Sequence, residues 1–119
     1  MVYFPQPSIH THMAKPYGLD CPIARTLDLI GDRWTILLLR DLLLHKTRRF
    51  QDLSDAFPGL TPSVLSGRLK ELEENGVVES RLYSDHPPRA EYLLTDKGRS
   101  LGPILKALRQ WGQAHTAPA

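Results

Sequence analysis

The chain has 119 residues, of which 41% are hydrophobic and 24% charged, as is typical of one soluble globular domain. The single cysteine, Cys21, excludes an intramolecular disulfide framework and a cysteine-rich zinc site within one chain. The longest apolar run ends at Arg40, far too short for a membrane span, and no signal-peptide pattern occurs, so we expect a cytoplasmic protein. The net charge is only +2, so the distribution of charge must indicate any nucleic-acid partner.

Residues 1–19 contain three prolines and no periodic apolar pattern, which predicts a poorly ordered N-terminal tail before a domain at residues 20–119. His10 and His12 have a spacing that occurs in metal sites, with Cys21 as a conceivable third ligand. A tail of this kind does not preform a metal site, so we expect neither a metal nor a cofactor.

Three helices are predicted before residue 57. The first begins at Asp20-Cys21-Pro22, where a capping residue precedes a proline suited to the first turn, and runs to Ile30. A second is expected over residues 33–44 and a short third over residues 50–56, since apolar residues recur there at helical spacing.

The clearest helix follows the Pro58-Gly59 turn. Thr61 and Pro62 form a helix start, and Asn75-Gly76 forms a stop with glycine at the position that favours left-handed backbone. Between them one apolar stripe is formed by Leu65, Leu69 and Leu72.

Residues 77–83 and 90–94 have strand character. Residues 84–89 between them are too many for a tight turn, so we expect a β-hairpin with an extended tip. Thr95 then caps a last helix to about residue 114, in which Pro103 either produces a kink or marks the true start. The apolar side of this helix consists of Leu101, Ile104, Leu105, Leu108 and Trp111.

This order predicts a mainly α fold with a small β-hairpin (α+β), in which a helix-turn-helix at about residues 50–75 is followed by a wing at about 77–94. An α-helix fits the major groove of B-DNA and presents side chains to base edges, and a wing reaches phosphates or the minor groove. The fold therefore indicates double-stranded DNA as the partner.

The chain also resembles the HxlR-type transcriptional regulators from about residue 20 to residue 115. The motifs that carry the resemblance occur in order: Cys21–Arg25, Gly31–Trp34, Arg48–Phe50, Pro58–Gly59, Leu69–Glu73, Pro87–Tyr92 and Leu94–Thr95. The resemblance implies a MarR-like winged helix-turn-helix, a homodimer with an interface built by the N- and C-terminal helices, and a two-fold DNA operator.

Nine residues are candidates for DNA contact. They are Arg48, Arg49, Thr61, Ser63, Ser66, Lys70, Arg81, His86 and Arg89. On the predicted recognition helix, Ser63, Ser66 and Lys70 face away from the leucine stripe, and the helix-turn-helix context favours groove contact over a merely solvated face. Capping explains Thr61 equally well.

The remaining candidates have structural alternatives of similar weight. Arg48 and Arg49 are suited to a phosphate clamp, or are simply exposed loop charges. Arg89 lies in the proline-proline-arginine motif, which favours phosphate or minor-groove contact, although the two prolines alone would stiffen the loop. Arg68 fits neither class, because Glu71 three residues on suggests a weak pair on the helix surface.

Cys21 is a candidate redox switch, because a helix N-terminus favours a thiolate. Regulators that resemble this chain use a cysteine near this position to sense oxidants or electrophiles. The competing interpretation, which we favour, is that Cys21 only packs. Without a second cysteine, a switch needs an intersubunit disulfide, a mixed disulfide or an adduct.

We therefore predict a sequence-specific transcriptional regulator that acts as a homodimer. The alternative is a winged-helix protein-interaction module, which the weak net charge and the short side chains of the recognition helix keep open. No nucleophile motif, phosphate loop or metal-protease motif occurs, so we do not expect an enzyme. No residue pattern identifies a small-molecule effector.

Overall fold

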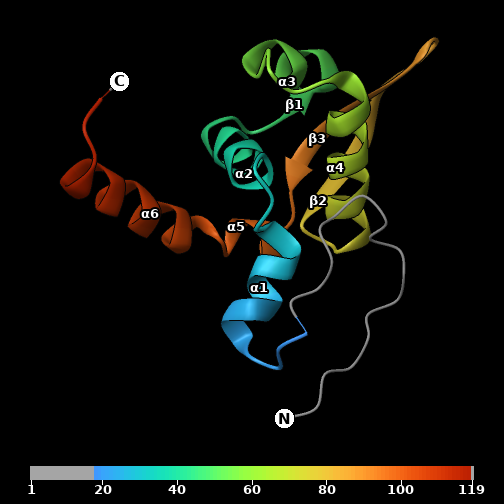
Figure 1. Ribbon diagram of the computed structural model, residues 1–119. Coiled ribbons are helices and arrows are strands. Elements are labelled where there is room, and N and C mark those ends of the chain that lie inside the picture. The colour runs from blue at the N-terminus through green and yellow to red at the C-terminus, as the bar shows by residue number, and fades with distance from the viewer. Residues whose placement is uncertain (1–17, 119) are drawn as a thin grey trace.

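The computed structural model describes residues 18–118, and its first two helices match the predicted ones. Helix α1 spans Pro22–Ile30 and α2 spans Thr35–Leu44. Cys21 is the N-cap of α1 and Pro22 is its first residue, which uses the position where a missing backbone N–H costs nothing. In Figure 1, α1 extends away from the rest of the domain. Most of the predicted tail, with His10 and His12, lies outside the described residues.

The helix-turn-helix consists of α3 (Phe50–Ala56) and α4 (Pro62–Glu74), as predicted. The Thr61 hydroxyl oxygen accepts a hydrogen bond from Val64 N at 3.2 Å and so caps α4. At the other end Gly76 has φ of +72°, and Val77 N donates to Leu72 O at 2.9 Å. This closing turn requires left-handed backbone, which explains the glycine.

Three antiparallel strands follow the order β1–β3–β2, with β1 at Arg48–Arg49, β2 at Val78–Asp85 and β3 at Pro88–Leu94. The strand β1 was not predicted. The prediction of an extended hairpin tip was wrong, because the strands continue to Asp85 and Pro88 and leave only two connecting residues. Residues 84–89 have turn-forming composition, but a bulge between Leu82 and Ser84 lets the ladder continue through them.

The last predicted helix consists of two. Helix α5 spans Asp96–Arg99 and α6 spans Gly102–His115, so Pro103 marks the start of a separate helix, as one of the two alternatives held. Thr95 caps α5 by accepting a hydrogen bond from Gly98 N at 3.1 Å. Figure 1 shows α6 projecting away from the other elements.

Two groups of buried side chains hold the domain together. One joins α1, α2, the sheet and the beginning of α6, and includes Ile30, Leu39, Leu72, Val77 and Leu105. The second holds the helix-turn-helix against α2 and consists of Leu38, Leu53, Leu60, Leu65 and Leu69. The leucine stripe of α4 is thus divided between both groups, which fixes the rotation of α4 about its axis. None of the helices within residues 18–118 has the length and apolar character that a membrane span requires.

Candidate nucleic-acid interface

The exposed side of α4 carries the predicted recognition residues. Ser63, Ser66 and Lys70 are all exposed, whereas Leu65 and Leu69 on the opposite side are at most 1% exposed. A 3.6-residue period places these three polar side chains along one strip of the helix. Thr61 is also exposed at the helix start, where its hydroxyl serves as the cap.

The strand β1 separates the two neighbouring arginines. Successive residues of a strand point to opposite faces of a sheet. The Arg48 guanidinium turns to the core side and forms an ion pair with Asp41, with Nε and Oδ1 2.8 Å apart. Arg49 is exposed, and its guanidinium carbon lies 4.4 Å from the centre of the Tyr83 ring. Arg48 is therefore engaged within the fold, and Arg49 is presented at the surface.

The pairing register places three arginines on the outer face of the sheet. Glu91 of β3 lies between Arg49 of β1 and Arg81 of β2, and Arg89 precedes Glu91 by two residues, so its side chain points to the same face. Arg81 also contacts Glu79 at 3.1 Å. His86 lies at the tip and is exposed, as is Arg89 beside it. The structure thus brings Arg49, Arg81 and Arg89 to one face and keeps Arg48 away from it.

Arg68 and Glu71 were predicted to form a pair on the helix surface, but the structure places them in a largely buried position. The Arg68 side chain is only 16% exposed, and its Nε lies 3.1 Å from Asp32 Oδ1, with Nη1 3.7 Å from Glu71 Oε1. Because Asp32 lies three residues before Thr35, the first residue of α2, this contact links the start of α2 to the middle of α4. The sequence showed only the neighbour three residues away, not the partner from another element.

Asp32 is also hydrogen bonded by the start of α2. Its carboxylate accepts from Trp34 N at 3.0 Å, from Thr35 N at 3.1 Å and from the Thr35 hydroxyl. Burial opposes the charged form, but the Thr35 and Trp34 hydrogen bonds and the Arg68 charge outweigh it and lower the pKa of Asp32 below 3.8. Asp32 therefore stays ionised at neutral pH.

Two surface residues were missed by the sequence analysis. Tyr83 contacts Arg49 on the wing, and Val64, 38% exposed, lies beside Ser63 at the start of α4. An apolar side chain there is suited to a thymine methyl group. Nothing in the sequence marks Tyr83 beyond the β-type composition of its strand, because its partner comes from a strand that was not predicted.

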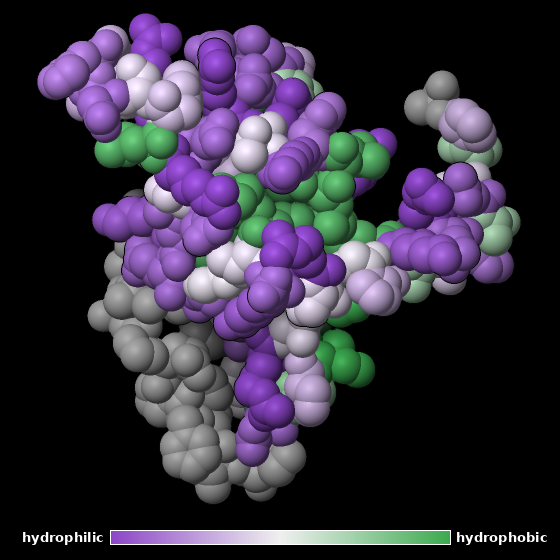
Figure 2. Space-filling view, turned by 180° about the vertical axis from the view of Figure 1, so that it is seen from behind, coloured by the Kyte–Doolittle hydropathy of each residue, from purple (hydrophilic) through white to green (hydrophobic). Residues whose placement is uncertain are grey.

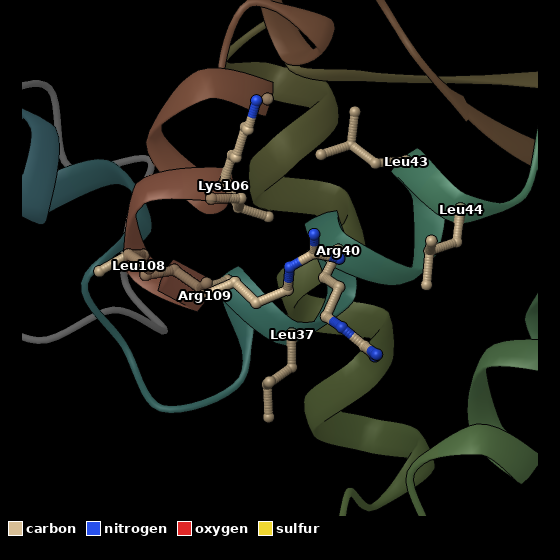
Figure 3. Close-up of a pocket in the computed structure, with 10 residues that line it drawn as sticks. Leu37, Arg40, Leu43, Leu44, Lys106, Leu108 and Arg109 are labelled. Carbon is tan, nitrogen blue, oxygen red and sulfur yellow. The ribbon is translucent and has the colours of Figure 1, made fainter. Parts of the chain in front are cut away.

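A separate apolar surface lies away from the wing. Figure 2 shows hydrophobic residues gathered at the centre of the face seen from behind, next to the helix that projects at one side. A groove of about 520 Å³ lies between α2 and α6. Figure 3 shows its leucines from both helices and its three cationic side chains; the labelled residues are Leu37, Arg40, Leu43, Leu44, Lys106, Leu108 and Arg109.

The apolar faces of α1 and α6 extend this surface. Ile23 is 72% exposed and Trp111 63% exposed, and Leu27, Ile104 and Leu108 are also exposed. Of the five apolar residues predicted for the last helix, only Leu105 is buried. Trp34, unlike the exposed Trp111, packs within the domain. Its ring lies edge-on against Phe57 of the helix-turn-helix, with ring centres 6.2 Å apart.

Cys21 is half-buried at the N-terminus of α1 and forms no disulfide. Within the part of the chain that the structure describes, no three metal-ligating side chains gather at one place.

Comparison with known proteins agrees with this architecture. Residues 29–119 match the model of a family described as HxlR-like helix-turn-helix. The HTH-type transcriptional regulator YdeP of Bacillus subtilis is 38% identical over 95 residues, covering 80% of this chain and 73% of that protein. The regulator YdzF of the same organism is 39% identical over 99 residues, covering 83% of this chain and 91% of that protein.

Solved structures show the same winged-helix fold. The redox regulator HypR in its oxidized form is 35% identical with a TM-score of 0.75, covering 82% of this chain and 100% of that one. The reduced transcriptional regulator YodB of B. subtilis is 29% identical with a TM-score of 0.70, covering 85% of this chain and 99% of that one. This chain therefore belongs to the HxlR-like helix-turn-helix family and is a transcriptional regulator of the helix-turn-helix type.

Proposed function

We propose that this protein binds double-stranded DNA in a sequence-specific manner, as a cytoplasmic homodimer on a two-fold operator. The observation that carries the proposal is a recognition helix with an exposed polar strip, followed by a wing whose outer face presents Arg49, Arg81 and Arg89. Ser63, Ser66 and Lys70 of α4 read base edges, with Val64 beside them. The wing arginines and His86 contact phosphates or the minor groove.

Two of the candidate residues take a further role in the structure. Arg48 supports the fold through Asp41, so we do not include it among the phosphate contacts. The hydroxyl oxygen of Thr61 caps α4, which leaves its O–H free to donate to a phosphate at the same position.

The dimer is supported by the apolar surface of α1, α2 and α6. Exposed apolar patches of this extent on a small domain mark an interaction surface. A second copy is the occupant we propose, because the same surface on both subunits is self-complementary in a two-fold dimer. Two recognition helices then enter successive major grooves about 34–36 Å apart.

A fluorescence-anisotropy titration tests the DNA proposal. The probe is labelled duplex from upstream of the protein's own gene, with unlabelled random duplex as competitor and salt varied. Tight binding that survives the competitor supports a sequence-specific reader. Arg89→Ala is expected to weaken binding to every sequence and to flatten the salt dependence by about 0.9 in log K against log salt for each phosphate that the variant no longer neutralises.

A matched variant separates local from general charge effects. Arg99→Ala removes the same charge from α5, which follows the end of β3 farthest from the wing tip. This variant should bind DNA as wild type does. Ser63→Ala or Ser66→Ala should instead change sequence preference. If folded protein shows no salt-dependent DNA binding, the DNA proposal fails and the alternative of a protein-interaction module gains support.

A response to oxidants or electrophiles through Cys21 is the second candidate. It is supported by the position of Cys21 at the start of α1, on the proposed dimer surface, and by the similarity to HypR, a redox regulator, and to YodB, whose diamide-treated form has been solved. Diamide treatment should change operator binding of wild type and yield an intersubunit disulfide or a mixed disulfide with added glutathione. An identical response in Cys21→Ser would remove Cys21 from the mechanism.

A further inference from the structure

Tyr83 contacts the one wing arginine that originates outside the hairpin. Arg49 belongs to β1, and the centre of the Tyr83 ring on β2 lies 4.4 Å from its guanidinium carbon. At this distance the positive charge is attracted by the negative face of the ring. Two elements far apart in the sequence thus meet at a single cation–π pair.

Both members of the pair have a fixed backbone. Arg49 pairs with Glu91 of β3, and its backbone N donates to Asp52 Oδ2 at 2.9 Å at the start of α3. Tyr83 occupies the bulge between Leu82 and Ser84, and such bulges commonly re-aim a side chain. The flexible part of the arrangement is therefore the long Arg49 side chain, and the Tyr83 ring restricts it.

The cation–π contact leaves hydrogen-bond donors of Arg49 for a ligand. A guanidinium carries five N–H donors, more than one aromatic ring can occupy, and these donors match the oxygens of a phosphate. Within residues 18–118, Arg49 has no carboxylate at salt-bridge distance, unlike Arg48, which is paired with Asp41. Arg81 and Arg89 add positive charge on the same face, where Glu91 between Arg49 and Arg81 is the opposing charge.

We propose that Tyr83 is a positioning residue for DNA binding, which holds the Arg49 guanidinium in place to contact a backbone phosphate. This inference rests on the proposed function. An arginine held in advance loses less side-chain freedom when it binds, so the ring increases affinity without touching DNA. Because the ligand is a phosphate, the effect is independent of DNA sequence.

The test is an anisotropy titration of labelled random-sequence duplex at several salt concentrations. Arg49→Ala should weaken binding and reduce the salt slope by about 0.9. Tyr83→Ala should weaken binding about two- to five-fold, the range of an exposed cation–π contact. Tyr83→Phe keeps the ring and should bind like wild type, and Tyr83→Ala should have no added effect in the Arg49→Ala background.

Leu82→Ala is the matched control, because Leu82 is the neighbouring exposed residue and points to the other face of β2. It should bind like wild type, and circular dichroism should show every variant folded. Additive effects of Tyr83→Ala and Arg49→Ala, or weakening by Tyr83→Phe equal to that of Tyr83→Ala, would overturn the inference. If the wild type binds DNA, and Arg89→Ala weakens this binding while Tyr83→Ala leaves it unchanged, the inference about Tyr83 fails and the proposed function stands. Absence of wild-type DNA binding overturns the proposed function as well.

Discussion

Arg48 and Arg49 show how one residue step decides the role of a side chain. In the sequence both are loop cations with the same claim to a phosphate. In the structure they form a two-residue strand, so Arg48 reaches Asp41 and Arg49 reaches Tyr83. No alternating pattern can be recognised in two residues, so the sequence alone does not separate the roles of Arg48 and Arg49.

Arg48→Met should reduce the free energy of unfolding by about 2 kcal/mol, because it leaves the Asp41 carboxylate unpaired where only 10% of that side chain is exposed. The value is below that for fully buried pairs, since Arg48 is itself partly exposed. Urea denaturation measures the change.

Arg49→Met is the control for that experiment. It removes an exposed contact and should cost only about 0.5 kcal/mol. The double variant Asp41→Asn/Arg48→Met should recover part of the loss, because the unpaired charge is gone. Equal losses for Arg48→Met and Arg49→Met would contradict the separation of the two arginines into fold and surface roles.

At the level of elements, the segment before α2 holds the recognition helix in place. Asp32 contacts Arg68 of α4, and Trp34 packs against Phe57 in the turn before α4. A Cβ at Gly59 would lie 3.3 Å from the Trp34 ring, so this turn approaches Trp34 closely. Most of the helices, and the capping roles of Thr61, Gly76 and Thr95, were predictable from local patterns. This junction was not, because its contacts join residues from separate elements.

Asp32→Asn should destabilise the protein in a pH-dependent way. The pKa of Asp32 is lower in the folded chain than the ordinary value of 3.8, so its charge stabilises the fold above that value. The stabilisation is lost as pH falls through the lower folded pKa. The free energy of unfolding of wild type should exceed that of Asp32→Asn by about 1–3 kcal/mol at pH 7, and this difference should shrink below about pH 4.

Urea denaturation at a series of pH values measures this difference. Asp85→Asn, at the exposed end of β2, should stay within about 0.5 kcal/mol of wild type. A difference between wild type and Asp32→Asn that is the same at pH 7 and at pH 3 would mean that the carboxylate charge is not what stabilises the junction.

At the level of the whole molecule, α6 is held at only one end. Leu105 is its one buried residue, and Ile104, Leu108 and Trp111 are exposed in the monomer. An isolated helix of this length is marginal in water, so a projecting helix with an apolar face needs a partner. Sequence periodicity identified this face correctly but gave no means of telling whether the same chain or a second copy covers it.

Trp111→Ala and Leu108→Glu should therefore convert the proposed dimer to monomers. A buried tryptophan anchor at an interface contributes at least about 2 kcal/mol, equivalent to about a thirty-fold rise in the dimer dissociation constant. Leu108→Glu should also raise it, because the substitution removes an apolar contact and places a carboxylate in the interface. Sedimentation velocity over a range of concentrations measures the constant, with Leu82→Ala on the wing as control.

The dimer variants also separate assembly from DNA contact. A monomer with an intact recognition helix and wing should keep its weak, salt-dependent binding to random duplex. It should lose most of its affinity for a two-fold site, because the second half-site no longer binds as part of the same complex. If Trp111→Ala and Leu108→Glu both remain dimers with unchanged operator affinity, the apolar face of α6 is not the subunit interface, and the dimer must form through another surface.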